Sequence, residues 1–493
     1  MGEQQGLPAG QPEASTGVDS EALAAQLDQI AGASEWQVRQ VAERETQLFV
    51  IGTQVEARRT VTNQRAQVLI LNDHAAHAAP ARTVAPKAEA GQDGTSAAAA
   101  SAPPELAQTQ PVRGWATFTL LAADASDPAR LRARLDEGVF MAGLTDNQPY
   151  HLPTLPPEGF PAVQISDPAL TESGASGQLE RALETARATL EAAVAAEVGV
   201  RLSSAELFLT RESLRVRNSR HLTGASTGTR VALDAILIAR EGEAEAEVHI
   251  EMERRRLADL DLGGTIAAYA GYARDTLRAV TPPTSRGPVV VSGPALPALL
   301  TPLIFHASAQ ARFLGISRFT LGQPLTGAEL RGDRLSLSSD ALYPFGTKSA
   351  PFDAEGVPAT RVALVVDGVV RAHWAEQRYA EYLGIPATGA FANLVLGAGN
   401  WPAADLVNGG TVYQIVEFSF MNPDPVSGDF ASEIRLGYRH DPDGTVTPIK
   451  GGTLSGNLFD ALADIRLSHE TQFAGDYVGP VALRFGQLTI AGE

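Results

Sequence analysis

The chain has 493 residues, 44% of them hydrophobic and 19% charged, which is typical of a globular protein with two or more domains. Its formal net charge of -18 has the wrong sign for a phosphate-binding surface, so a nucleic-acid partner is disfavoured. The absence of cysteine excludes disulfides, a thiol nucleophile and thiolate-ligated zinc within this sequence.

The N-terminal third alternates between structured and unstructured composition. Residues 1–20 are polar and lack a basic or apolar leader segment, so we expect a disordered tail and a cytoplasmic protein. A helix is predicted over Glu21–Ala31, and strands are predicted over Gln47–Glu56, Arg65–Asn72 and Trp115–Leu121. Residues 74–112 between them are rich in Ala, Pro, Gln, Thr and Gly. Such a composition buries too little apolar area to offset its ordering entropy, which indicates a low-complexity insertion.

The central region carries the clearest periodicity. Apolar residues recur at helical spacing over Gln178–Val198, and a second helix over Leu260–Val280 ends at Pro282-Pro283. Gly242–Glu253 alternates apolar and acidic residues, which predicts a strand paired with Arg230–Ala239 in an antiparallel hairpin. The apolar stretch around Val289–Phe305 is interrupted by Gly and Pro, so it is a poor membrane span.

These elements predict an α+β protein with two mixed domains and largely antiparallel sheets. We place an N-terminal and central domain over residues 21–283, with the insertion at 74–112, and a β-rich domain over residues 284–493. The Pro pair marks the boundary between them.

Several short patterns admit a chemical reading, but a structural interpretation is favoured for each. His249, Glu251 and Glu253 share one strand face, as metal ligands do, yet an exposed acidic face explains them equally well. Ser226 lies in G-A-S-T-G, a pattern resembling the serine-hydrolase elbow, but a strand follows it where the elbow needs a helix. We therefore interpret Ser226 as a turn residue.

Further glycine-containing and charged patterns are weak. Gly346–Ser349 ends like a phosphate-binding loop but lacks its first glycine, and Gly397 with Gly399 lacks the third glycine of a dinucleotide fingerprint. Arg254–Arg256 is interpreted as a solvated strand edge. The Asn-Pro-Asp-Pro and Asp-Pro-Asp-Gly segments at 422–425 and 441–444 are interpreted as turns.

An ordered set of segments in the C-terminal half resembles the TldD/PmbA family, also called modulators of gyrase. It begins with F-D-x-E-G-x-P at Phe352–Pro358 and continues with 380–390, 428–430 and 453–462. Upstream, Val216-Arg-Asn-Ser with Gly224 resembles the family's central pattern. The family-motif positions to which no role is assigned are Phe352, Asp353, Glu355, Gly356, Pro358, Gly456 and Asn457. Turn formation explains the Phe352–Pro358 segment without a chemical role.

The resemblance implies a metal site that this sequence lacks. TldD-type members carry H-E-x-x-x-H, in which histidines hold the metal and the glutamate activates water. The similar region here places Thr301 at the first His, Pro302 at the Glu, and retains only His306. This departure is the pattern of the TldE/PmbA-like branch, and a lone His among apolar residues is typical of a satisfied core residue.

The resemblance therefore implies a non-catalytic subunit of a heteromeric TldD/TldE-type metallopeptidase, which shapes its chamber and binds unstructured peptides. We expect no catalytic residue, metal or other cofactor in this chain, a zinc or other divalent ion in a TldD-like partner subunit, and no membrane partner. Two alternatives stay open. One is a stand-alone peptide- or protein-binding homodimer without proteolysis, and the other is an atypical hydrolase that uses Asp353, Glu355 and His306.

Overall fold

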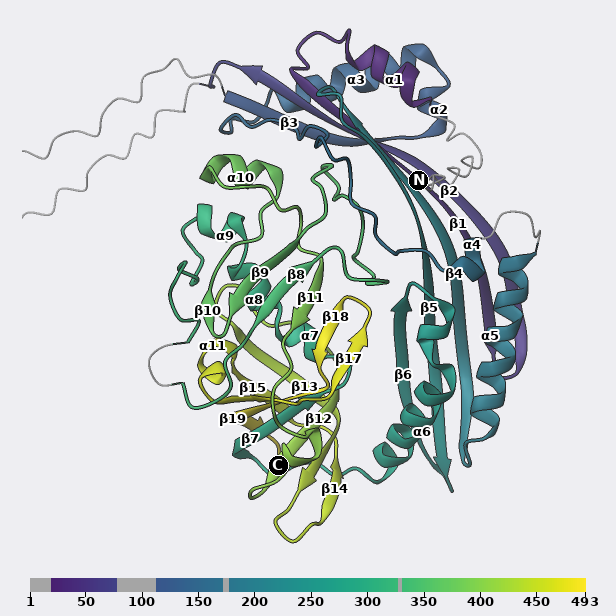
Figure 1. Cartoon of the computed structure of the whole chain (residues 1–493). Coiled ribbons are helices and arrows are strands. Elements are labelled where there is room, and N and C mark those ends of the chain that lie inside the picture. The colour runs from purple at the N-terminus through teal and green to yellow at the C-terminus, as the bar shows by residue number, and fades with distance from the viewer. Residues whose placement is uncertain (1–18, 78–111, 172–176, 327–329) are drawn as a thin grey trace, which may run out of the picture.

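The computed structural model describes residues 19–77, 112–171, 177–326 and 330–493. Nearly all of the predicted tail at 1–20 and most of the predicted insertion at 74–112 lie outside these residues. A long curved sheet stands beside a rounder β-rich unit (Figure 1). The predicted α+β class with largely antiparallel sheets and a β-rich C-terminal half is confirmed.

A six-stranded antiparallel sheet in the order β3-β2-β1-β4-β5-β6 forms the N-terminal part. Its strands are β1 (Glu35–Ile51), β2 (Gln54–His74), β3 (Val112–Leu120), β4 (Val200–Asn218), β5 (Thr223–Glu241) and β6 (Ala244–Arg254). The associated helices are α1 (Ser20–Leu27), α2 (Ala122–Ala125), α3 (Pro128–Ala142), α4 (Pro168–Thr171), α5 (Gln178–Ala195) and α6 (Leu262–Arg278).

All the longer helices cover the same face of this sheet, at opposite ends. In β1, Val38 packs with α1 and α3, whereas Leu48 packs with α5 and α6. Both positions are even-numbered, so their side chains leave the same face of the strand. Val41 leaves the other face and packs against Phe352 of the C-terminal part. The C-terminal domain thus packs against the opposite face of the sheet, although α6 also reaches that domain, since the Tyr438 hydroxyl donates to Asp275 of α6 at 2.8 Å.

The C-terminal part contains two sheets around one large core. Strands β12, β7, β19, β15 and β13 form a closed ring because β12 pairs with β13, and β14 and β16 extend it. The second sheet has the order β10-β9-β8-β11-β18-β17. Only the pairs β7–β12 and β11–β18 are parallel among the named strands of the described residues. The strands are β7 (Ser285–Ser292), β8 (Leu337–Asp340), β9 (Arg361–Val366), β10 (Val369–Val370), β11 (Asn393–Leu396), β12 (Val412–Phe418), β13 (Asp429–His440), β14 (Val446–Ile449), β15 (Thr453–Asn457), β16 (Ile465–Leu467), β17 (Thr471–Ala474), β18 (Tyr477–Pro480) and β19 (Ala482–Ala491).

Short helices connect these strands and carry several residues of interest. They are α7 (Leu296–Leu299), α8 (Thr301–His306), α9 (Ala309–Phe313), α10 (Gln377–Leu383) and α11 (Leu458–Ala461). In the described part of the chain, no helix is both long enough and apolar enough to cross a membrane.

Two local predictions were wrong. The predicted strand Gln47–Glu56 runs through the β1–β2 turn at Gly52, whose φ of +60° suits glycine. Because apolar residues lie on both sides of this turn, the sequence pattern predicted one continuous strand. Ser226 is not a turn residue, because it lies inside β5 and pairs with Leu214. The long pairing with β4 extends the strand beyond the segment that alternation alone predicted.

Candidate functional site

Helix α8 occupies the place of the metal motif suggested by the resemblance. Thr301 is exposed and donates its hydroxyl proton to the Ala298 carbonyl oxygen at 2.7 Å. Pro302 is buried and carries no ligand atom or base. Only His306 of this helix therefore offers a side chain that binds transition metals.

Both ring nitrogens of His306 are already engaged, and the side chain is fully buried. Nδ1 accepts a hydrogen bond from the backbone N–H of Arg318 at 3.0 Å, and Nε2 lies 2.9 Å from the Val426 carbonyl oxygen, to which it donates. Burial lowers the pKa of His306, which favours this neutral tautomer. In the described residues, no set of three metal-ligating side chains includes His306. These residues do not fit a hydrolytic metal centre.

Gly456 and Asn457 support the loop that accepts the His306 proton. The Asn457 amide donates to the Ser427 carbonyl oxygen at 2.9 Å and to Asp429 at 2.8 Å. A Cβ at Gly456 would lie 2.5 Å from a methyl group of Leu488, so glycine lets β15 pack closely against β19 there. Both family-motif residues thus position backbone rather than reacting groups.

The Phe352–Pro358 segment is a tight loop organised by Asp353. One carboxylate oxygen accepts backbone N–H groups of Glu355 and Val357, each at 2.9 Å, and the other accepts the N–H of Ala390 at 2.9 Å. Burial raises the pKa of Asp353, while these donors oppose that rise by stabilising the carboxylate. Asp353 therefore holds two segments of the family pattern together and has no oxygen left without a partner.

The same loop contacts the N-terminal sheet through Phe352. The rings of Phe352 and Phe160 are 4.6 Å apart, and Leu222 belongs to the same buried cluster. An added Cβ at Gly224 would lie 2.7 Å from Phe160 and 2.9 Å from Phe352. The upstream and downstream patterns that resembled the family therefore meet at this interdomain contact.

Replacing Gly224 by Ala is expected to destabilise the protein by about 1–3 kcal/mol, because the new methyl group forces the two rings apart. Urea unfolding followed by tryptophan fluorescence measures the change. Gly287→Ala is the matched control: it also lies in a strand, and its Cβ would meet nothing within 4 Å. Equal effects of the two substitutions would contradict this account of the contact.

Glu355 and Glu376 add two half-buried acids to this loop. Burial, followed by repulsion from Asp353, raises the pKa of Glu355 to about 7. Burial also raises the pKa of Glu376. Glu355 accepts the backbone N–H of Gln377 at 3.0 Å. A carboxyl that titrates near neutrality is a candidate acid or base, but its known partner here is the start of α10.

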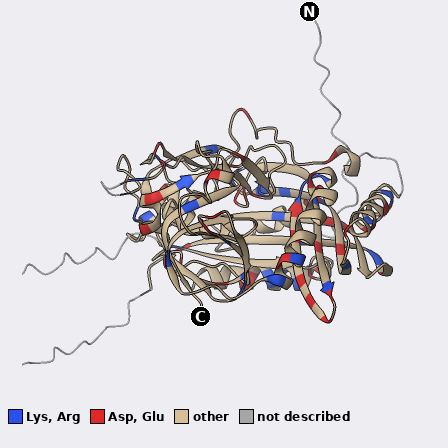
Figure 2. Ribbon diagram, turned by 90° about the horizontal axis from the view of Figure 1, so that it is seen from below, with Lys and Arg blue, Asp and Glu red and all other residues tan. Residues whose placement is uncertain are grey.

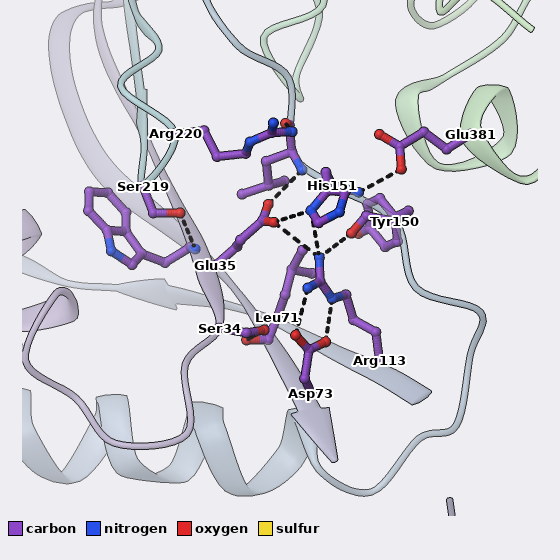
Figure 3. Close-up of polar contacts among 12 residues, drawn as sticks. Ser34, Glu35, Leu71, Asp73, Arg113, Tyr150, His151, Ser219, Arg220 and Glu381 are labelled. Atoms are coloured by element: carbon purple, nitrogen blue, oxygen red, sulfur yellow. Dashed lines mark hydrogen bonds and ion pairs between the residues drawn. The ribbon is translucent and has the colours of Figure 1, made fainter. Parts of the chain in front are cut away.

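A buried polar network beside this loop was missed in the sequence. The Arg113 guanidinium binds both carboxylate oxygens of Asp73, at 2.5 and 2.7 Å, and Glu35 at 3.2 Å (Figure 3). Arg113 lowers the pKa of Asp73 through these contacts. Glu35 also accepts the backbone N–H of Leu152 at 2.7 Å and lies 2.5 Å from His151 Nδ1.

This network reaches the C-terminal domain through α10. The backbone N–H of His151 donates to Glu381 at 2.9 Å, and Gln377 donates to the His151 carbonyl oxygen at 2.9 Å (Figure 3 shows the Glu381 contact). Its members come from separate strands, a connecting segment and a helix, so no local spacing could have indicated it. Its contacts explain how the domains are held at this end.

At the other end, a cleft of about 770 Å³ is lined by residues of both domains. Strand β6 is the last strand of the N-terminal sheet and β17 is the last strand of the second C-terminal sheet, and both border this cleft (Figure 1). Within the described residues, β6 pairs only with β5 and β17 only with β18. Two sheet edges that pair with no further strand in the described residues therefore flank one cleft.

The cleft walls combine apolar and charged side chains. Over the ribbon as a whole, Lys and Arg positions are interspersed with Asp and Glu positions (Figure 2). Glu251 and Glu253 are exposed and line the cleft, whereas His249 pairs with Asp234 at 2.9 Å. The lining side chains that bear charge or an aromatic ring are Phe208, Asp234, Glu251, Glu253, Arg254, Tyr269, Tyr272, Lys348 and Asp476.

The predicted solvated edge at Arg254–Arg256 is wrong for Arg255. Its guanidinium donates to the carbonyl oxygens of Thr347 and Ser349 at 2.7 and 3.1 Å, and burial lowers its pKa. The phosphate-loop-like segment Gly346–Ser349 thus presents carbonyl groups to an arginine rather than amides to an anion. Gly399 is likewise structural, since its Cβ would lie 2.1 Å from the Leu467 carbonyl oxygen.

Comparison with known proteins gives a family match for the C-terminal part of the chain. Residues 284–492 match the family described as the PmbA/TldA metallopeptidase C-terminal domain. The metalloprotease PmbA of Escherichia coli O157:H7 is 26% identical over 300 residues, covering 58% of this chain and 64% of that protein. A Synechocystis metalloprotease is 28% identical over 223 residues, covering 42% of this chain and 47% of that protein. The aligned part is thus less than two thirds of each relative.

The fold likeness extends over nearly the whole chain. TldE from Thermococcus kodakarensis superposes with a TM-score of 0.73 at 16% identity, covering 96% of this chain and 99% of that one. At this identity the likeness concerns the fold alone. Taken together, residues 284–492 match the PmbA/TldA metallopeptidase C-terminal domain family, and nearly the whole chain has the fold of TldE.

Proposed function

We propose that this chain is a TldE/PmbA-like, non-catalytic subunit of a heteromeric TldD/TldE-type metallopeptidase. The observation that carries the proposal is the hydrogen bonding of His306, whose two ring nitrogens are occupied by Arg318 and Val426. With Thr301 and Pro302 beside it, α8 supplies neither a ligand set nor a base. The metal and the water-activating glutamate would come from a TldD-like partner.

The proposed contribution of this chain is to hold an unstructured peptide in the cleft between β6 and β17. An extended peptide can add to a sheet edge through main-chain hydrogen bonds, which do not depend on its sequence. Most strands of a folded substrate already pair within its own sheets, so the cleft would favour flexible segments. Glu251 and Glu253 on the cleft wall favour peptides with basic side chains.

Filling the cleft is expected to weaken peptide binding by roughly tenfold or more, since a loss of about 1.4 kcal/mol suffices. Ala268 is exposed on α6 and lines the cleft, so Ala268→Trp places a large ring inside it. Ala267→Trp is the matched control, because Ala267 is exposed on the same helix but does not line the cleft. Fluorescence anisotropy of a labelled, unstructured Lys-rich peptide gives the affinity.

A second peptide separates strand addition from simple charge attraction. N-methylation at alternate residues removes main-chain donors without changing charge, so binding should fall if the peptide extends a sheet. Unchanged binding of the methylated peptide, or equal weakening by both Trp variants, would contradict the proposed mode.

The subunit role is tested separately by reconstitution. Adding the chain to a TldD-like protein from the same organism is expected to raise peptide cleavage and to give a complex that co-elutes in size-exclusion chromatography. No complex and no change in cleavage would reject the heteromeric role and leave the homodimer. Chelator-sensitive cleavage by the chain alone would instead favour the atypical hydrolase. Against that alternative, both Asp353 oxygens are occupied by backbone donors, and no hydrogen bond or ion pair joins Asp353 or Glu355 to His306 within the described residues.

A further inference from the structure

Two histidines and an aspartate gather at the end of β2, far along the chain from α8. His74 is the last residue of β2, His77 follows three residues later, and Asp146 lies in the loop after α3. Asp146 Oδ1 is 3.1 Å from His74 Nε2 and 2.6 Å from His77 Nδ1. One ligand atom from each of the three side chains lies within 4.8 Å of the others.

The hydrogen-bond partners of His74 leave one polar contact that a neutral ring cannot satisfy. Its Nδ1 lies 3.1 Å from the Asn72 carbonyl oxygen, and its Nε2 faces the Asp146 carboxylate. Both partners are acceptors, whereas a neutral imidazole has only one N–H donor. If Nδ1–H binds the carbonyl group, Nε2 presents a lone pair to a carboxylate oxygen. A carbonyl-bound Nδ1–H with a free Nε2 is the arrangement commonly seen in metal-ligating histidines.

The surrounding backbone holds Asp146 in this position. The His77 N–H donates to Asp146 Oδ2 at 2.8 Å, which leaves Oδ1 directed at the two rings. The loop carrying Asp146 is docked on β3, where the Arg113 N–H donates to the Asn147 carbonyl oxygen at 3.0 Å. Gly114 permits this close approach, because a Cβ there would lie 2.7 Å from the Thr145 carbonyl oxygen.

We propose that His74, His77 and Asp146 form a binding site for one divalent transition-metal ion, of which Zn²⁺ is the best match. Two imidazoles with one carboxylate suit zinc, and three protein ligands leave a fourth position for water or another group. Tetrahedral ligands at about 2.1 Å from an ion lie roughly 3.4 Å apart, so the Asp146 contact with His74, at 3.1 Å, needs little change, whereas the contact with His77, at 2.6 Å, must lengthen by roughly 0.8 Å, which the exposed His77 side chain permits. This site departs from our expectation that the chain itself holds no metal.

The position of the site indicates which segments of the chain a bound ion would join. His74 pairs with Val112 across the β2–β3 ladder, and residues 78–111 connect His77 to Val112. A metal ion would therefore join the two ends of that connection to the α3 loop. It is a structural clamp at the outer strand of the sheet, distinct from the α8 region and from the cleft.

The test uses the full chain after removal of metal with a chelator. Competition with a chromophoric zinc indicator is expected to show one Zn²⁺ bound per chain, and Co²⁺ should give a visible absorption spectrum typical of low coordination number. His77→Ala and Asp146→Asn should each weaken Zn²⁺ binding by roughly tenfold or more, since even outer-shell changes cost that much. Affinity should fall as the pH is lowered, because binding needs unprotonated imidazole.

His249→Ala is the matched control. His249 is also exposed and also faces one carboxylate, Asp234, at 2.9 Å, but no third ligand joins that pair in the described residues. Its replacement should leave Zn²⁺ affinity unchanged. The proposal is overturned if the wild-type chain binds no Zn²⁺, or if one equivalent still binds with unchanged affinity when His74 and His77 are both replaced by Ala. Because His77 is largely exposed, its Ala variant should fold normally, which the thermal transition verifies.

Discussion

Replacing Asp353 by Ala is expected to lower the free energy of unfolding by about 3–5 kcal/mol, more than any other single substitution considered for this chain. Three backbone N–H groups, those of Glu355, Val357 and Ala390, would lose their acceptor at a part-buried position. Water cannot replace that acceptor without opening the loop. The loop also carries Phe352, so the contact between the domains should loosen with it.

Urea unfolding followed by fluorescence and circular dichroism measures the loss. Asp353→Asn should cost less, because its carbonyl oxygen still accepts from one of the two segments. Asp424→Ala is the control: Asp424 also accepts two backbone N–H groups, from Val426 and Ser427, but in an exposed loop. Its replacement should cost only about 1 kcal/mol. An Asp353→Ala effect no larger than the Asp424→Ala effect would show that the buried loop is not organised by this carboxylate.

Replacing Glu355 by Gln is expected to make the protein more stable, relative to wild type, as the pH rises from acidic to alkaline values. The pKa of Glu355 is raised from 4.5 to about 7 by burial and by Asp353. The folded state therefore holds this proton more tightly than the unfolded state does. The carboxyl's contribution to stability is full below the unfolded pKa, falls as the pH rises through the interval up to about 7, and stays at its lowest value above it.

The size of this change follows from the shift. The raised pKa of Glu355 corresponds to a change of at most about 3 kcal/mol in the free energy of unfolding between pH 4 and pH 8. Gln has no proton to lose, and its carbonyl oxygen can still accept the Gln377 N–H that Glu355 accepts at 3.0 Å. The difference in urea midpoint between variant and wild type should therefore move in favour of Glu355→Gln as the pH rises.

Glu243→Gln serves as the control, since Glu243 is exposed in the turn between β5 and β6. It should show little pH-dependent difference from wild type. A Glu355→Gln difference that is the same at both ends of the pH range would mean that the pKa of this carboxyl is the same in the folded and the unfolded protein. Because Glu355 lies next to α10 and the network of Glu35 and Arg113, this titration acts at the joint between the domains.

The sequence indicated the position of His306 but not the groups to which it is hydrogen-bonded. His306 stood out because the resemblance placed it in a known motif, and its apolar neighbours suggested a core residue. The identities of its partners, the Arg318 N–H and the Val426 carbonyl group, could not be predicted. Nearly every residue has the same backbone N–H and carbonyl groups. A sequence therefore cannot distinguish a histidine that is hydrogen-bonded to backbone groups from one that is free to bind a metal.

The sequence by itself determined the elements whose signal is local. The helical period over α5, the alternation in β6 and the Pro pair after α6 depend on spacing within one segment, and each produced the element expected there. The ordered family segments indicated the family for the same reason, since a motif is read along the chain.

Only the tertiary structure decided which distant residues meet. The contact of Gly224 with Phe352, the binding of Arg255 to the 346–349 segment, and the convergence of His74 with Asp146 all depend on strand register and domain packing. Each pair is separated by many residues, and a one-residue change of register turns a side chain to the opposite face of a sheet. The spacing of residues within one segment cannot predict the register, because the register depends on how the cores of both domains are buried.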